Sequence, residues 1–347
     1  MKAVVLTGVR AVEIRDVPKP SLKAEDDVLL RTELAGLCGS DLHYFVVDNV
    51  SGERVKYPAI VGHECAAVVE TVGRRVGSLR PGDRVAIEPA ISCGTCDQCE
   101  AGRLNTCRNI GFLGHPGEKD GCLAEYFIMP ERNCFRLPED LSMTEGMLAE
   151  PLSIALHALQ LAGASPGRHI AVLGTGTIGL CLILAAKAAG VPEVWSTDKV
   201  EARVAASRRA GANWAGNPDR EDIVKTILAE RPLGLDSVFD CSGDPAAIDQ
   251  AVELVKPGGR IFLVGIPLLE RVPLKFRTLR RKEIALQNVR RQNKCLEKAL
   301  QHILDKSIDA AWLATHTFKL EEAARAFATA ADRTDGVLKA AIKFDRS

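Results

Sequence analysis

Hydrophobic and polar positions follow two different patterns in the two halves of the chain. In the first half, short valine-rich runs at residues 2–6, 27–32 and 66–72 are separated by turn signals such as Pro81-Gly82-Asp83. Runs of this length, bounded by proline and glycine, predict strands. We therefore expect a compact, mostly β domain here.

After Pro151 the pattern changes to alanine-rich helical segments that alternate with apolar strands. The predicted strands are 169–173, 193–197, 237–240 and 260–264, and the predicted helices are 178–189, 201–209 and 245–255. Strand and helix repeated in turn predict a parallel sheet covered on both faces. Beyond about residue 289, helices at 295–304 and 320–330 and a strand at 338–344 are expected.

Length and charge narrow the class of protein. A chain of 347 residues suits two domains of about 150 residues each. Lysine plus arginine equal aspartate plus glutamate at 45 each, so we expect neither a nucleic-acid nor a membrane partner. No apolar run approaches the roughly 20 residues that span a bilayer.

The N-terminus and the cysteines point to a reducing compartment. Charged residues interrupt the first segment too early for a signal peptide, so we expect a cytoplasmic protein. Its eleven cysteines should then stay reduced, and metal binding explains them better than disulfides.

A dinucleotide-binding motif follows the first strand of the second half. Gly174-Thr-Gly176-Thr-Ile-Gly179 connects that strand to a helix. Gly174 permits the tight turn, Gly176 lets backbone approach the pyrophosphate, and Gly179 allows helix–strand packing. Asp198 ends the next strand and can accept hydrogen bonds from ribose hydroxyls, which favours NAD over NADP. Lys199 and Arg203 leave NADP open, since either could hold its extra phosphate.

Four cysteines lie close together in the sequence, after the strand-like run at 66–72 and before Pro151. They are Cys93, Cys96, Cys99 and Cys107. Four thiolates close a tetrahedron around zinc, which predicts a structural site. An iron–sulfur cluster is the main alternative, but the spacing to the last cysteine and the absence of a following proline differ from the bacterial ferredoxin pattern. A nucleic-acid zinc module is less favoured because the flanking residues are not rich in lysine and arginine.

A second set of candidate metal ligands is dispersed along the chain on both sides of the four cysteines. Cys38, His63 and a carboxylate from Glu64 or Glu150 would provide three ligands and leave zinc an open position, as a catalytic site requires. Each residue alone has an ordinary structural explanation. Their presence beside a dinucleotide motif is what favours catalysis.

These motifs resemble the zinc-containing medium-chain dehydrogenases, and among them the sorbitol (polyol) dehydrogenases. The likeness covers essentially the whole chain, with Cys38-Gly-Ser-Asp-Leu-His-Tyr44, Gly62-His63-Glu64 and Glu150-Pro-Leu-Ser as its most specific segments. It implies an α/β protein, with a GroES-like, mostly β catalytic domain at 1–152 and 291–347 and a doubly wound Rossmann domain at 153–290. It also implies a homotetramer or homodimer.

The resemblance assigns roles residue by residue. It implies catalytic zinc on Cys38, His63 and Glu150, with Glu64 as an alternative or outer ligand. Ser40 would accept the hydroxyl proton and His43 would relay it. The substrate residues would be Tyr44, Glu150, Arg290 and Arg291, and the further cofactor contacts would be Ile178, Asp198, Arg203, Val264, Gly265, Ile266, Asn288, Val289 and Arg290.

The expected reaction is zinc-dependent, NAD-linked oxidation of a secondary alcohol on a polyol, inositol or sugar-like substrate. Arg291 stands where sorbitol dehydrogenases have tyrosine, and the four cysteines are missing from some animal polyol enzymes, so the match is closer to the microbial branch. A threonine or amino-alcohol dehydrogenase is one alternative. A catalytically silent NAD- or zinc-binding protein is another, but it would have no need of Ser40 and His43.

Overall fold

The computed structural model describes residues 1–163 and 167–345. They form two compact units, one of residues 1–150 with 296–347 and the other of residues 151–295. The expected fold class is confirmed: a mostly β unit is combined with a parallel, doubly wound sheet.

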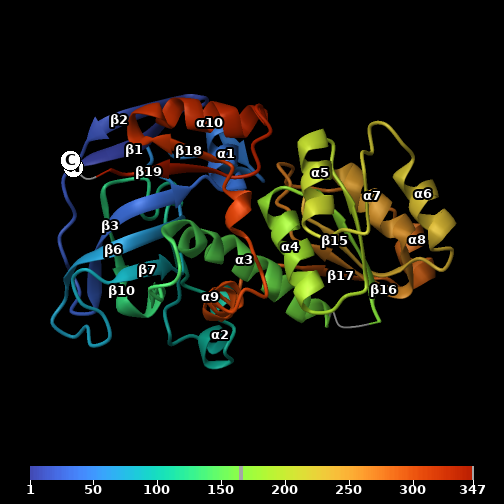
Figure 1. Cartoon of the computed structure of the whole chain (residues 1–347), viewed down its shortest axis with the longest axis horizontal. Helices are drawn as coiled ribbons and strands as arrows, with labels where there is room; N and C mark the ends of the chain where they lie inside the picture. Colours follow the sequence, from blue (N-terminus) through green and yellow to red (C-terminus); the bar gives the residue numbers. More distant parts are fainter. Residues whose placement is uncertain (164–166, 346–347) are drawn as a thin grey trace. The chain divides into compact units, whose positions relative to one another are not determined.

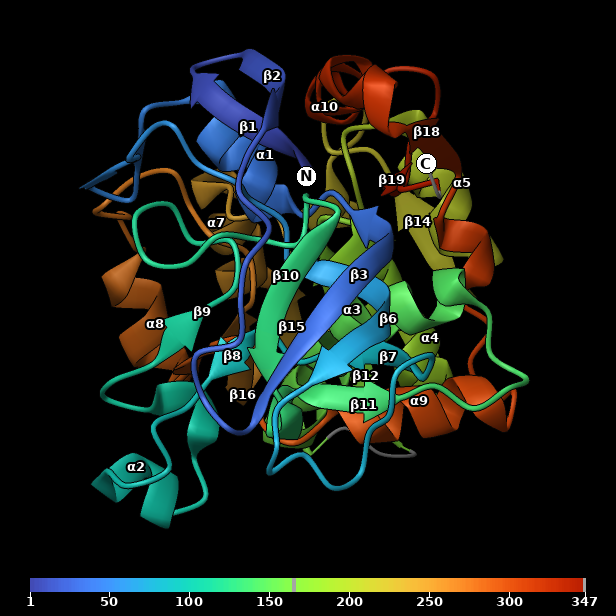
Figure 2. The same ribbon diagram turned by 90° about the vertical axis from the view of Figure 1, so that its left-hand side faces the viewer.

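A seven-stranded sheet forms the centre of the first unit. Its strand order is β11-β7-β6-β3-β19-β18, and β10 also pairs with β3. Figure 2 shows β3 lying between β10 and β6. The strands are β3 (Asp27–Gly36), β6 (Glu64–Val72), β7 (Arg84–Ile87), β10 (Tyr126–Pro130), β11 (Cys134–Arg136), β18 (His316–Lys319) and β19 (Ala340–Lys343). The pairing of β19 with β3 brings the end of the chain against its beginning.

Shorter elements complete the first unit. Three two-stranded sheets pair β1 (Lys2–Gly8) with β2 (Ala11–Asp16), β4 (Asn49–Val50) with β5 (Glu53–Arg54), and β8 (Ala90–Ile91) with β9 (Gly111–Phe112). The helices are α1 (Gly39–Val46), α2 (Asp97–Glu100), α9 (Leu296–Leu304) and α10 (Ala323–Asp332). Phe45 of α1 and Phe327 of α10 are both buried, with their rings 5.3 Å apart, so this contact joins the two helices in the core.

The second unit is built on a six-stranded parallel sheet of order β14-β13-β12-β15-β16-β17. The strands are β12 (His169–Leu173), β13 (Glu193–Thr197), β14 (Trp214–Gly216), β15 (Leu235–Asp240), β16 (Val255–Leu263) and β17 (Ala285–Asn288). The order reverses at β12, which lies between β13 and β15. In such sheets ligands bind at the carboxyl ends of the strands beside this reversal.

Helices surround this sheet (Figure 1). They are α4 (Thr177–Ala188), α5 (Glu201–Arg209), α6 (Ile223–Glu230), α7 (Pro245–Leu254) and α8 (Phe276–Lys282), and α3 (Met143–Ala162) enters from the first unit. Right-handed connections on either side of β12 place α4 and α5 on one face and α7 and α8 on the other. Both faces of the sheet are thus covered, which explains why β12, β13 and β15 are buried along nearly their whole length.

Most of the predicted elements are present with shifted ends. The strand expected at 260–264 begins at Val255, directly after α7. The helix expected at 320–330 is a short 3₁₀ turn at Leu320–Glu322 followed by α10. Within the described residues, no helix has the length and apolarity needed to cross a membrane.

Candidate functional site

Asp41 joins the two chain segments that carry the dispersed ligands. It lies in the first turn of α1, three residues after Cys38, and is fully buried. Its carboxylate accepts hydrogen bonds from the backbone amides of Cys38 (2.9 Å) and Gly62 (3.1 Å). One buried side chain therefore fixes the backbone beside both Cys38 and His63.

Asp41 also faces the ring of His63. Its Oδ1 lies 3.6 Å from Nδ1 of the imidazole, and the other face of the ring packs against Phe112 at 5.0 Å between centroids. The separation of 3.6 Å is longer than a hydrogen bond, so the carboxylate acts on the imidazole through its charge. A proton on Nδ1 would be stabilised by that charge, and Nε2 would then be the nitrogen that could hold a metal. The sequence motif contained Asp41, but its role was missed.

Cys38, His63 and Glu64 come together as expected. One donor atom from each lies within 4.8 Å of the other two. Glu150 of α3 is buried beside them and interacts electrostatically with Glu64, His63 and Cys38. Sulfur, nitrogen and oxygen donors in this number suit zinc with one position open.

The charges at this place fit a bound cation. Burial, followed by the charge of Glu64, raises the pKa of Cys38 to about 12. Burial and Glu64 together raise the pKa of Glu150 well above its usual value. Both groups would lose a proton readily only beside added positive charge, which a divalent metal supplies.

A buried lysine, Lys339, stands at the edge of this cluster. It comes just before β19, and its ammonium group pairs with Glu64. Burial alone would lower the pKa of Lys339, but Glu64 and Cys38 raise it, so the lysine is charged. The sequence reading missed Lys339 because it lies in an apolar stretch read as strand.

Ser40, His43 and Tyr44 lie on one side of α1, as their spacing of three and four residues requires. The Ser40 side chain hydrogen-bonds to Cys38. Burial, followed by the charge of Arg333, lowers the pKa of His43 and keeps its ring neutral at pH 7. The Tyr44 ring meets His115 edge-on at 6.0 Å.

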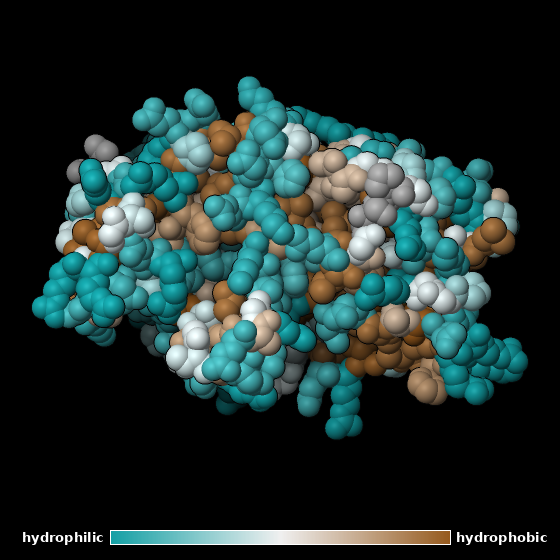
Figure 3. Space-filling view, turned by 90° about the horizontal axis from the view of Figure 1, so that it is seen from below, coloured by the Kyte–Doolittle hydropathy of each residue, from teal (hydrophilic) through white to brown (hydrophobic). Residues whose placement is uncertain are grey.

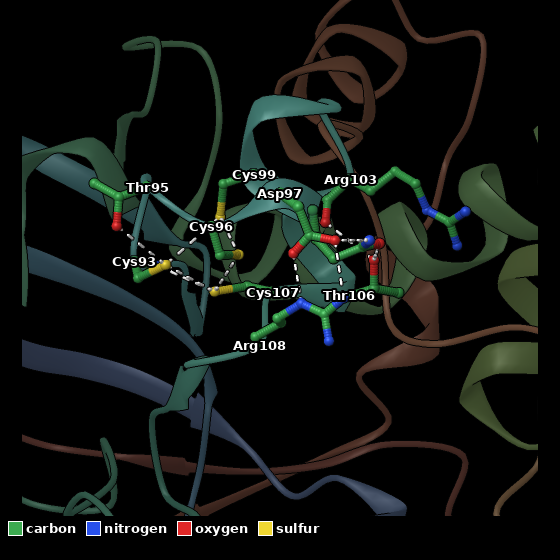
Figure 4. Close-up of polar contacts among 10 residues, drawn as sticks. Cys93, Thr95, Cys96, Asp97, Cys99, Arg103, Thr106, Cys107 and Arg108 are labelled. Carbon is green, nitrogen blue, oxygen red and sulfur yellow. Dashed lines mark hydrogen bonds and ion pairs between the residues drawn. The ribbon is translucent and has the colours of Figure 1, made fainter.

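The four cysteines of the loop converge around α2 (Figure 4). Four of the six sulfur–sulfur distances are 3.4 to 4.0 Å, and all four sulfurs lie within 4.8 Å of one another. Zinc–sulfur bonds of about 2.3 Å in a tetrahedron place sulfurs about 3.8 Å apart, so the set fits one zinc ion. None of the described cysteines forms a disulfide.

The loop is held in shape by its own polar contacts. Asp97 accepts hydrogen bonds from the guanidinium of Arg108, at 2.5 Å from Nε and 2.9 Å from Nη2. The backbone amide of Cys93 donates to Cys107 at 3.2 Å. Hydrogen bonds, chiefly from the Thr95 backbone, lower the pKa of Cys93 to about 6, which favours the thiolate that zinc binds.

The three glycines of the dinucleotide motif are needed for different structural reasons. Gly174 has φ +88°, and a Cβ there would lie 2.7 Å from Ser242; a Cβ at Gly179 would lie 2.1 Å from the Gly174 carbonyl oxygen. At Gly176, by contrast, the nearest atom to a Cβ is Arg203 Nη1 at 3.8 Å. The fold thus requires the outer two glycines, and the middle one leaves open space for a ligand.

Asp198 is held where β13 ends. Its carboxylate accepts hydrogen bonds from the backbone amides of Thr175 (2.7 Å) and Val200 (2.9 Å). Lys199 pairs with Asp244 at 2.8 Å, so its charge is largely offset. Lys199 and Arg203 were the two residues that could hold the extra phosphate of NADP. Only Arg203 of these two lies beside the glycine turn, near Gly176.

The other predicted cofactor residues lie at the same edge of the sheet. Val264, Gly265 and Ile266 follow β16, and the amides of Val264 and Gly265 both donate to the Asp240 carbonyl oxygen at 2.8 Å. Asn288 ends β17, and the backbone amide of Val289 donates a hydrogen bond to the Leu263 carbonyl oxygen at 2.9 Å. Arg290 and Arg291 come next, with Arg291 at φ +52°. Ile178 lies in the first turn of α4.

Comparison with known families gives two matches. Residues 24–139 match the alcohol dehydrogenase GroES-like domain, and residues 177–305 match the zinc-binding dehydrogenase family. The first segment contains the dispersed ligands Cys38, His63 and Glu64 and the four cysteines, and the second begins at Thr177, within the glycine motif.

Individual relatives span nearly the whole chain. Sorbitol dehydrogenase of Bacillus subtilis is 34% identical over 93% of this chain and 91% of its own length. L-idonate 5-dehydrogenase of Vitis vinifera is 35% identical over 94% and 90%. The crystal structure of galactitol-1-phosphate dehydrogenase from Escherichia coli superposes with a TM-score of 0.89 at 28% identity, covering 99% of this chain and all of that one.

Proposed function

We propose that this chain, which belongs to the zinc-containing medium-chain alcohol dehydrogenase family, oxidises a secondary alcohol of a polyol, inositol or sugar-like substrate to a ketone with NAD. The observation that carries the proposal is the cluster of Cys38, His63 and Glu64 donors within 4.8 Å of one another. A site with mixed donor atoms and an open coordination position is typical of catalytic zinc, whereas structural zinc sites are closed.

Zinc at this site would act as a Lewis acid on a hydroxyl group, and NAD would accept the hydride. The chain itself would move the proton. Ser40 hydrogen-bonds to Cys38, and the neutral His43 follows one helical turn later. We propose that Ser40 accepts the hydroxyl proton and that His43 relays it outward.

We propose NAD as the preferred cofactor. The Asp198 carboxylate at the end of β13 would repel the extra phosphate of NADP. The pairing of Lys199 with Asp244 supports this preference, because it removes one cation that could have offset the repulsion.

We propose a substrate with several hydroxyl groups because polar side chains accompany the metal ligands. Glu150 and Tyr44 belong to the first unit, and the family resemblance adds Arg290 and Arg291. A site that hydrogen-bonds several hydroxyl groups of its substrate discriminates against an alcohol that has only one, so such an alcohol should be a poorer substrate. The test is the rate of NADH formation with vicinal polyols, sugar acids and simple secondary alcohols.

We further propose that the chain forms a homodimer or homotetramer. Ile266, Leu268, Leu269 and Phe276 are 53%, 43%, 52% and 71% exposed, and β17 beside them in sequence is an edge strand. Figure 3 shows hydrophobic residues gathered at the lower right of one face. Exposed apolar patches and open sheet edges are typical of interfaces. Phe276→Asp should shift the mass measured by light scattering towards the monomer.

We propose a cytoplasmic location. None of the described cysteines is joined in a disulfide, and the zinc site on the loop requires its four as thiolates. A reducing compartment maintains that state.

A further inference from the structure

The segment that follows β9 carries a histidine, His115, to which neither the metal ligands nor the proton relay gives a role. Its ring meets the Tyr44 ring edge-on, with the two centroids 6.0 Å apart. Three residues earlier in the same segment, the Phe112 ring packs against His63 at 5.0 Å. One short segment therefore contacts both a candidate metal ligand and an expected substrate residue.

Backbone contacts fix this segment against the chain that precedes His63. A Cβ on Gly114 would lie 2.5 Å from the Gly62 carbonyl oxygen, so the two backbones pack directly on each other. Further along, the amide of Cys122 donates a hydrogen bond to the same carbonyl oxygen at 2.9 Å. His115 therefore has a defined position relative to His63.

Tyr44 is held in place by a different contact. The Tyr57 hydroxyl donates a hydrogen bond to the Tyr44 carbonyl oxygen at 2.6 Å, near the end of α1. Tyr44 also lies one helical turn after Ser40, whose side chain hydrogen-bonds to Cys38. Tyr44 and His115 thus continue the row of polar side chains that begins at Cys38, and all of them belong to the first unit.

The His115 imidazole has hydrogen-bonding capacity that the protein does not use. Its Nδ1 is buried and has no hydrogen-bond partner among the described residues, although Glu118 Oε1 lies 3.4 Å away. Buried polar atoms are nearly always paired. A neutral imidazole donates from one nitrogen and accepts at the other, which suits a hydroxyl group because a hydroxyl also does both.

We propose that His115 is a specificity-determining residue that hydrogen-bonds a substrate hydroxyl other than the one oxidised, beside the Tyr44 ring. The inference rests on the proposed function, in which Ser40 and His43 serve the reacting hydroxyl. It identifies a group within the first unit that distinguishes a polyol from an alcohol with a single hydroxyl.

The test compares wild type with His115→Leu and His115→Gln. His316→Leu is the matched control, because the His316 ring also lies beside an aromatic ring, that of Phe318 at 6.2 Å, and beside a carboxylate, that of Asp335 at 3.2 Å. The substrates are sorbitol, xylitol and myo-inositol, each with its singly deoxygenated analogues. The measured quantity is the ratio of kcat/KM for a polyol to kcat/KM for each analogue.

In wild type, the analogue that lacks the recognised hydroxyl should have a kcat/KM about 10- to 100-fold lower than the complete polyol, because it leaves His115 without a partner. His115→Leu should abolish this difference. His115→Gln should retain part of it, since an amide also donates and accepts. His316→Leu should keep the wild-type ratio. Loss of folded protein cancels in the ratio, so a purely structural role of His115 would not change it.

A second readout does not depend on turnover. In zinc-loaded protein labelled with ¹³C-histidine, the ring signal of His115 is the one of seven that His115→Leu removes. This signal should shift when a polyol is added in the absence of NAD, and it should shift much less with 2-propanol.

Equal ratios in wild type and His115→Leu would overturn the inference, as would a His115 signal that does not move at a saturating polyol concentration. If His115→Leu fails to fold, His115→Gln and the wild-type spectrum still decide. Absence of NADH formation from every polyol would instead overturn the proposed function, and the spectrum would then still report whether His115 binds a polyol.

Discussion

Oδ1 of Asp41 lies 3.6 Å from Nδ1 of His63, and the same carboxylate accepts hydrogen bonds from the amides of Cys38 and Gly62. A single buried group thus lies beside the imidazole of one candidate metal ligand and fixes the backbone of another. Outer partners of this kind matter to a metal nearly as much as its ligands do.

Asp41→Asn should weaken zinc binding at the Cys38 site by 10- to 100-fold. The amide that replaces the carboxylate stabilises neither the Nδ1 proton of His63 nor a positive metal. Zinc competition with a chelator measures the change, and Asp48→Asn, at an exposed position shortly after α1, is the control. Wild-type zinc affinity in Asp41→Asn would show that His63 is oriented by other groups.

Cys99→Ser should lower the zinc content from about two ions per chain to about one. Cys99 is a buried member of the four-thiol set, so the loop that carries α2 should also lose order. Elemental analysis and limited proteolysis measure the two effects. Cys134→Ser is the control: it removes a thiol outside both clusters and should keep both ions. Detection of iron with labile sulfide in the wild-type protein would refute a zinc site on this loop.

Asp198→Ala should raise the ratio of kcat/KM for NADP to that for NAD. The variant removes the charge that repels the ribose phosphate, although it also leaves the Thr175 and Val200 amides without an acceptor. A ratio is the appropriate measure because it cancels the loss of folded protein. Asp244→Ala should have a smaller effect, and an unchanged ratio in Asp198→Ala would place cofactor choice elsewhere.

The interactions of Asp236 are expected to make a pH-dependent contribution to the stability of the second unit. Its carboxylate accepts from the His169 amide at 2.8 Å and pairs with Lys256 at 2.5 Å. Burial opposes ionisation, but these bonds prevail and lower the pKa of Asp236. A lowered folded-state pKa stabilises the fold above the unfolded value of about 4, and this contribution is lost as the pH falls through the folded value.

Asp236→Asn should therefore reduce the free energy of unfolding by about 1 kcal/mol at pH 7, and the difference from wild type should shrink as the pH falls below about 4. Urea unfolding at several pH values measures it. Asp249→Asn, a partly exposed residue on α7, is the control. A difference between Asp236→Asn and wild type that stays constant with pH would mean that the charge of Asp236 is not what stabilises the fold.

Local patterns predicted the parts of this molecule that are contiguous in the chain. The strand, glycine turn and helix around Gly174 span one short segment, and the four cysteines lie within another, so spacing alone revealed both. Lys339 gave no such signal. Its partner Glu64 is brought near by strand pairing, which no local pattern records.

The choice between Glu64 and Glu150 shows the same limit. Both carboxylates follow plausible motifs, and the sequence left both open. The structure places Glu64 within reach of Cys38 and His63, but also binds it to Lys339. The ion pair between Glu64 and Lys339 is a tertiary contact, which no local sequence pattern records.

The central claim is that the open site at Cys38 performs the reaction, while the four-cysteine site supports the fold. The most direct measurement is the rate of NADH formation from a vicinal polyol as metal-free protein is titrated with zinc, for wild type and for Cys38→Ala. The account predicts that wild-type turnover rises with the zinc bound beyond the first ion, and that Cys38→Ala binds about one zinc ion per chain and produces no NADH. Turnover by Cys38→Ala at a rate close to that of wild type would contradict it.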